Sequence, residues 1–142
     1  MSNLNAFLKP AYTEKKIEVI VGDRFNDEEG NPVPIVMKSL TQAQLNQIAK
    51  ASTHERKIGG KVVQEVDANE HLNRCLIESI IDPDMKNREL CRSYGTEDPI
   101  ELPTKMFFID EFEKLAKAFA KLNGIKQDEE GMLDIQGEVT KN

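Results

Sequence analysis

The clearest pattern of apolar and polar positions lies in residues 107–125, which read FFIDEFEKLAKAFAKLNGI. Apolar side chains recur there at intervals of three and four, and these are Phe108, Phe112, Leu115, Ala116, Phe119 and Leu122. This spacing places them on one stripe of an α-helix. Asp110 with Glu113 has the pattern of a capping box, and Gly124 favours the end of the helix. An aromatic stripe needs cover, so we expect it to pack on the domain core, with the alternative that part of it receives a partner.

Three short segments alternate instead with a period of two, which predicts strands at residues 16–22, 35–40 and 61–66. A polar turn at residues 27–32 separates the first two segments and indicates a hairpin with an irregular loop. Pro32 and Pro34 have no amide proton, so the second strand should either start at an edge or pair fully only from Ile35. We expect the third segment to join this hairpin in one small antiparallel sheet.

Helical spacing begins after Thr41, which forms a capping-box pattern with Gln44. It predicts a helix that runs to about residue 57 and ends at Gly59 and Gly60. A basic cluster near that end is then best explained as a solvated helix terminus, and it consists of Lys50, His54, Arg56, Lys57 and Lys61.

The next helix is predicted to start at Asp67 and to end before Pro83. One apolar stripe along it consists of Leu72, Cys75, Leu76 and Ile80, and Ile77 with Ile81 adds a second ridge. We therefore expect a central helix that is buried on more than one side. A shorter helix at residues 87–94 and a connector broken by Pro103 complete the chain up to the aromatic helix.

These elements predict an α+β fold, in which a small antiparallel sheet of about three strands is packed by three or more helices and helix exceeds strand. We expect one globular domain over residues 1–125, with an apolar helical turn near residues 4–8 docked on it. Residues 126–142 hold five acidic and two basic residues, which predicts a disordered acidic tail. Met132, Leu133 and Ile135 are the tail residues that could bind a partner.

The sequence offers no reaction chemistry, so we expect no enzyme, no catalytic residue, no metal site and no cofactor. His54 and His71 lack a second ligand or a nucleophile at a usable spacing, and we expect both at the surface. Cys75 and Cys91 lack CxxC spacing, which fits a reducing cytoplasm. The formal net charge of −6 argues against nucleic acid, and no apolar run suits a membrane.

Three passages, taken in order, resemble the XkdN-like tail assembly chaperones of contractile-tailed phages and prophage-derived particles. The first is residues 25–34 with its acidic turn, the second runs from Asp82-Pro83 to Ser93-Tyr94-Gly95, and the third is Glu111-Phe112, Leu115 and Asn123-Gly124-Ile125. Residues 109–112, Ile-Asp-Glu-Phe, depart from the Pro-Gly-Glu-Tyr-like step that often opens the last helix of this family.

The resemblance implies a protein of the bacterial host cytoplasm that binds the tape-measure protein and keeps it soluble until the tail tube polymerises. Tail-tube subunits are a second implied partner, and self-association is left open. The alternative is a structural tail or baseplate component that is retained in the particle. Apolar surface in excess of one helix contact suggests partner-binding residues on two helices, namely Ile77, Ile81, Phe107, Phe112 and Phe119. The tail adds Met132, Leu133 and Ile135 as a short adhesive segment.

Overall fold

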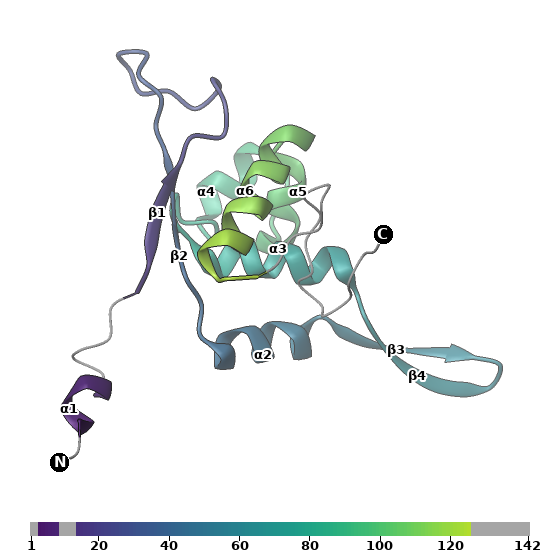
Figure 1. The fold of residues 1–142 in the computed structure, drawn as a ribbon. Coiled ribbons are helices and arrows are strands. Elements are labelled where there is room, and N and C mark those ends of the chain that lie inside the picture. Colours follow the sequence, from purple (N-terminus) through teal and green to yellow (C-terminus); the bar gives the residue numbers. More distant parts are fainter. Residues whose placement is uncertain (1–2, 9–13, 126–142) are drawn as a thin grey trace, which may run out of the picture.

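The computed structural model describes residues 3–8 and 14–125 of the chain. Its main sheet has the strand order β1-β2-β5, with β1 at Lys16–Val19, β2 at Ile35–Lys38 and β5 at Ile80–Asp82. Both pairings are antiparallel, and β2 begins at Ile35, as the two prolines before it predict. The helices of the body lie on one side of this sheet (Figure 1). The α+β class is confirmed, and so are the first two strands.

The predicted third strand forms, but not in this sheet. Strand β4 (Lys61–Val66) pairs with β3 (Thr53–Ile58) in a separate two-stranded hairpin. Gly59 and Gly60 both have positive φ, 59° and 82°, as a two-residue hairpin turn requires. The predicted helix to residue 57 is therefore too long: α2 covers Gln42–Ala51, and the basic cluster lies mainly on the hairpin. The Thr41–Gln44 capping box is confirmed.

Helix α3 (Ala68–Ser79) is the central helix, as predicted. It packs against α2, the 3₁₀ helix η2 (Pro99–Glu101), α5 (Leu102–Met106) and α6 (Ile109–Leu122). Its buried side chains face several of these neighbours, and they are His71, Asn73, Cys75, Leu76, Ile77 and Ser79. The helix ends three residues before the predicted end at residue 82, because Ile80–Asp82 forms strand β5, in which Ile80 pairs with Met37 and Asp82 with Val36 of β2. The predicted surface position of His71 is wrong, since only 4% of it is exposed.

The aromatic helix is α6, and it begins at Ile109. Its first turn is capped by Glu111, whose Oε1 accepts the backbone N–H of Phe108 at 2.9 Å. The predicted cap by Asp110 and Glu113 is therefore wrong. Because the helix starts after Phe108, this ring is 62% exposed, whereas Phe107 is in the core and makes an edge contact with Phe25.

Arg24, in the first half of the β1–β2 loop, fixes this loop to the start of α6. Its guanidinium donates to both carboxylate oxygens of Glu111, at 2.9 and 2.6 Å, and to the carbonyl of Met106 at 2.7 Å. It also stacks on two rings, 4.6 Å from the centroid of Phe25 and 4.3 Å from that of Phe108. Hydrogen bonding from Arg24 lowers the pKa of Glu111. The Arg24–Glu111 pair therefore joins segments that are 87 residues apart.

The shorter helix α4 (Arg88–Ser93) is confirmed, with the Asn87 side chain accepting the N–H of Leu90. The helical turn α1 (Leu4–Phe7) also forms, but none of its residues is buried, so the expected docking is wrong. Residues 126–142 lie outside the described residues, and so do the expectations for the acidic tail. Within the described parts of the chain, no helix has the length and apolar character needed to span a bilayer.

Candidate functional site

A groove of about 480 Å³ runs over α3 between α2 and η2. Its lining divides by chemistry. The apolar residues, called its floor below, are Ile48, Ala51, Ile77, Pro99 and Ile100. The polar residues, called its rim below, are Gln44, Gln47, Arg74, Glu78, Lys86 and Asp98. An apolar floor inside a polar rim is the usual form of a site that receives an amphipathic peptide or helix.

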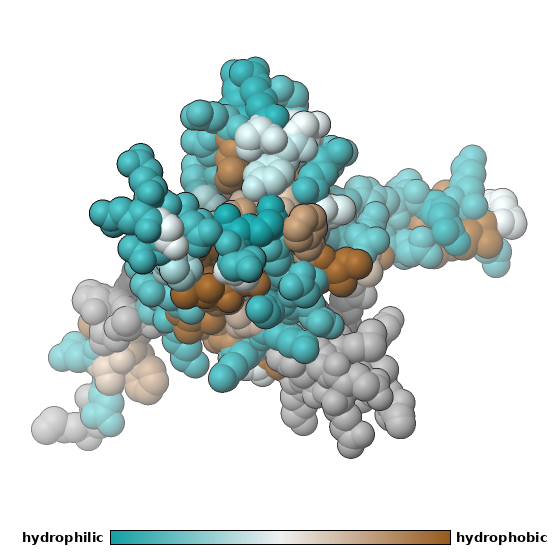
Figure 2. Space-filling view, turned by 90° about the horizontal axis from the view of Figure 1, so that it is seen from above, coloured by the Kyte–Doolittle hydropathy of each residue, from teal (hydrophilic) through white to brown (hydrophobic). Residues whose placement is uncertain are grey.

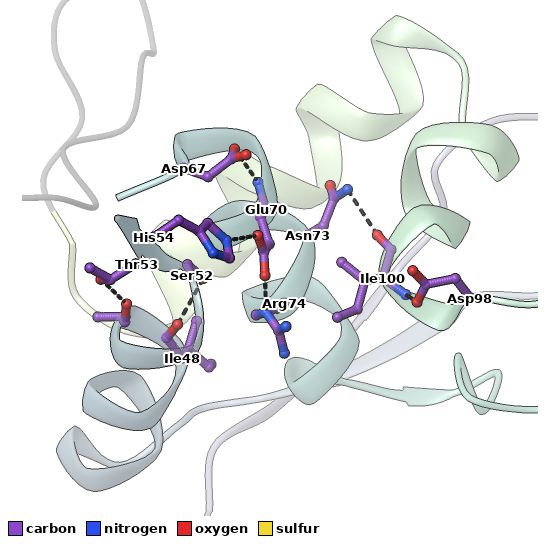
Figure 3. A network of polar contacts seen from close by, with 11 residues as sticks. Ile48, Ser52, Thr53, His54, Asp67, Glu70, Asn73, Arg74, Asp98 and Ile100 are labelled. Atoms are coloured by element: carbon purple, nitrogen blue, oxygen red, sulfur yellow. Dashed lines mark hydrogen bonds and ion pairs between the residues drawn. The ribbon is translucent and has the colours of Figure 1, made fainter. Parts of the chain in front are cut away.

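Arg74 lies on the rim, between Ile48 of α2 and Ile100 of η2 (Figure 3). Its Nε donates to Glu70 Oε2 at 2.8 Å, one helical turn away on α3. The other carboxylate oxygen of Glu70 bonds Nε2 of His54, at the base of the hairpin, at 2.7 Å. The hydrogen bond with His54, followed by that from Arg74, lowers the pKa of Glu70. The carboxylate of Glu70 thus orients Arg74 and joins the hairpin to α3.

The η2 wall is held by a buried amide on α3. Nδ2 of Asn73 donates to the carbonyl of Ile100 at 3.0 Å and to Oγ1 of Thr104 at 2.9 Å. The side chain of Asp98 accepts the N–H of Ile100 at 3.0 Å and so caps η2. Because these bonds fix the backbone of η2, Ile100 keeps its place in the groove.

The α2 wall is fixed at both ends of its helix. Thr41 and Gln44 form the capping box at the start, and Gln44 also lines the groove. At the other end, Oγ of the buried Ser52 donates to the carbonyl of Ile48 at 2.7 Å. Hydrogen bonds within the domain therefore fix both ends of the α2 wall.

The charges on the rim balance in number, since it holds two cations, Arg74 and Lys86, and two anions, Glu78 and Asp98. Lys86 also forms an exposed ion pair with Glu78 at 3.1 Å. Such a rim does not select a strongly charged ligand. Among the described residues, no three His, Cys, Asp or Glu side chains gather in a way that could hold a metal ion. The arrangement suits recognition of a neutral or mixed-charge helical surface.

The structure separates the residues that the sequence suggests for partner binding. Ile77 lines the groove, whereas Ile81 lies in β5, is 41% exposed and does not form a helical ridge with Ile77. Phe107 and Phe119 belong to the core, with Phe119 only 1% exposed, and Phe112 packs partly buried against it. Met132, Leu133 and Ile135 lie outside the described residues.

The sequence does not show which residues line the groove together with Ile77. Among them are Ile48, Ile100 and Arg74. Ile48 is part of the stripe that predicts α2, so the sequence shows which face of this helix is apolar. It does not show which element packs against that face. Ile100 stands between proline-containing segments, where no helical or strand period marks a face. Only the packing of α2 and η2 on the same helix brings these residues together.

Comparison with known proteins gives a consistent result. The profile of the family described as phage XkdN-like tail assembly chaperone protein matches residues 4–136. An uncharacterized protein of Bacillus subtilis strain 168, YqbN, is 29% identical over 131 residues, which is 89% of this chain and 88% of YqbN. The phage-like element PBSX protein XkdN of the same strain is 28% identical over 131 residues, with the same coverage. The crystal structure of the protein YqbN superposes with a TM-score of 0.74 at 26% identity, covering 89% of this chain and 99% of that one.

Proposed function

The chain belongs to the family of XkdN-like phage tail assembly chaperones, and from this we propose that it binds the tape-measure protein and keeps it soluble until the tail tube encloses it. The role in tail assembly is that of the family. The tape-measure protein as partner, the cytoplasm of the bacterial host as location and a further contact with tail-tube subunits are parts of the proposal.

The observation that supports this proposal best is the apolar floor of the groove between α2 and η2. A long helical protein with apolar stripes aggregates while it has no tube around it. A groove with Ile48, Ile77 and Ile100 along its floor can cover such a stripe at its i, i+3 and i+4 positions. The balanced rim allows release, because it adds no strong charge pairing that the tube subunits would have to overcome.

A substitution in the groove tests where the partner binds. Ala51 is exposed and lines the groove, so Ala51→Arg places a long side chain over the floor without removing a core residue. Ala43→Arg is the matched control, since Ala43 is also an exposed alanine of α2 but does not line the groove. We expect Ala51→Arg to weaken capture of the co-expressed tape-measure protein about tenfold, equivalent to about 1.4 kcal/mol, and Ala43→Arg to leave it unchanged.

The same co-expression measures solubility. If the tape-measure protein is neither more soluble nor captured in the presence of the wild-type chain, the proposed function is wrong. If it is captured equally by both arginine variants, the function stands and the groove is not the binding site. Gel analysis of purified particles tests the alternative, because a chaperone is absent from finished particles and a structural tail or baseplate component remains in them.

A further inference from the structure

The β3–β4 hairpin extends from the body as a two-stranded arm (Figure 1). Every residue of β4 is exposed, and so is every residue of β3 except Thr53. Four exposed aliphatic side chains lie on the arm, and they are Ile58, Val62, Val63 and Val66. Figure 2 shows brown, apolar side chains among teal ones along the arm at the right. A two-stranded ribbon that is exposed to solvent on both faces is only marginally stable alone, and further strands would stabilise it.

The strand register shows which backbone groups are available at the outer edge of β4. Thr53 is opposite Val66 and Arg56 is opposite Val63. One step beyond the arm, Asp67 N–H donates to the Ser52 carbonyl at 2.8 Å, so this pair marks a hydrogen-bonded position. Because such positions alternate along an antiparallel pair, Val63 and Glu65 bond towards β3, whereas Val62 and Gln64 direct their N–H and C=O outward. Among the described residues, β4 pairs with no strand other than β3.

Two side chains of opposite charge flank Val63 at equal distances along β4. Lys61 lies two residues before it and Glu65 two residues after it, so all three are on the same face of the ribbon. If two β4 strands pair antiparallel about a two-fold axis at Val63, each Lys61 is opposite a Glu65 of the other copy and the two Val63 side chains meet. Val62 and Gln64 are then opposite each other, and they are the residues whose backbone groups point outward.

We propose that the free edge of β4 pairs with the β4 edge of a second copy of this chain, giving a four-stranded antiparallel sheet across the dimer. The complementary charges select this occupant. Exposed edges are commonly protected by charges, but charges of opposite sign at symmetry-related positions attract a second copy instead of repelling it.

The outer edge of β3 is less suited to such pairing. A two-fold axis at Glu55 places two carboxylates opposite each other. An axis at Arg56 places Glu55 opposite Lys57 of the other copy, but it also places two guanidinium groups opposite each other at the axis. Like charges directly opposite are destabilising in an antiparallel pair. The β4 edge, which has no like-charged pair at its axis, is therefore the better suited of the two, and its pairing does not depend on binding to a tail protein.

Charge exchange tests the pairing with purified full-length protein alone. Lys61→Glu leaves only carboxylates at positions 61 and 65, and Glu65→Lys leaves only ammonium groups there. We expect sedimentation velocity to show dimers of the wild type that increase with concentration, and monomers for each variant.

An equimolar mixture of the two variants should dimerise again. In the mixed pair, the carboxylate introduced at position 61 of one chain lies opposite the ammonium group introduced at position 65 of the other, and the remaining native Glu65 lies opposite the remaining native Lys61. A wild type that stays monomeric up to high micromolar concentration, or a mixture that stays monomeric while the wild type dimerises, would overturn the proposal.

Proline variants test the edge itself. Gln64→Pro removes an outward N–H of β4, and Glu55→Pro removes an outward N–H of β3, so neither deletes a hydrogen bond within the arm. Dimerisation should be lost in Gln64→Pro and retained in Glu55→Pro, with both variants melting as cooperatively as the wild type. The opposite pattern, or equal loss in both variants, contradicts pairing through β4.

Discussion

Replacement of Arg24 by alanine should destabilise the body of the protein far more than replacement of a surface arginine. The substitution removes the hydrogen bonds to Glu111 and Met106 and the stacking on Phe25 and Phe108. It also leaves the carboxylate of Glu111, whose side chain is only 4% exposed, with the N–H of Phe108 as its remaining hydrogen-bond donor.

The structure allows an estimate of the size of this effect. Removing one partner of a fully buried ion pair costs roughly 3–5 kcal/mol. The Arg24 side chain is 30% exposed, so water screens part of the ion pair. After the substitution, water can also solvate part of the Glu111 carboxylate. We therefore expect a loss of about 2–3 kcal/mol in the free energy of unfolding, which for a domain of this size lowers Tm by roughly 10 °C.

Urea unfolding followed by circular dichroism measures this loss. Arg92→Ala is the matched control, because Arg92 forms an ion pair with Glu97 in which both side chains are more than half exposed. Its effect should be within about 0.5 kcal/mol of zero. If Arg24→Ala is as mild as Arg92→Ala, the Arg24–Glu111 pair does not stabilise the fold.

The same pair predicts a pH dependence. Arg24 lowers the pKa of Glu111 in the folded state, so the unfolded chain takes up the proton first as the pH falls. The stabilisation is fully present above the ordinary glutamate pKa of about 4.3 and is lost as the pH falls through the lower folded value. The difference in stability between the wild type and Arg24→Ala should therefore be constant near neutral pH and shrink below about pH 4.

Three further variants or treatments test other parts of the structure. Asn73→Ala leaves the carbonyl of Ile100 without its buried donor and should cost about 1–3 kcal/mol in urea unfolding; a loss below that of Arg92→Ala would contradict the role of Asn73 in holding η2. Phe119→Ala empties a position that is 1% exposed and should cost about 3–5 kcal/mol, or prevent folding, as judged by thermal melting and soluble yield. Burial raises the pKa of the Cys75 thiol to about 12, so this cysteine should react with a thiol reagent only after unfolding, and rapid labelling of the native protein would show that α3 opens readily.

Much of the fold can be predicted from the sequence, because local patterns and tertiary structure agree there. The capping residues Thr41 and Asp67 mark helix starts correctly, and Pro34 correctly delays the second strand. The central helix is predictable because its apolar positions exceed one stripe, which requires burial on more than one side.

The predictions are wrong where a local pattern fits two structures. Residues 53–58 contain good helix formers and continue the spacing of α2, but Gly59-Gly60 suits a hairpin turn as well as a helix end, and pairing with β4 decides the outcome. Ile80 and Ile81 continue the spacing of α3, yet they belong to strand β5, which pairs with β2 through Ile80 and Asp82. The groove could not be predicted, because it depends on how η2 packs on α3.

The place where the arm joins the body also bears on how this family can diversify. Ser52 and Asp67, the residues on either side of the arm, are joined by a hydrogen bond of 2.8 Å, and the helices that they terminate pack against each other. The arm is therefore a closed insertion between two neighbouring helices. Such an insertion can lengthen, shorten or change its sequence at little cost to the domain that carries it, since the entropy of loop closure grows only slowly with length. The body and the arm are thus free to evolve at different rates, and a related protein could lose the arm while keeping the groove.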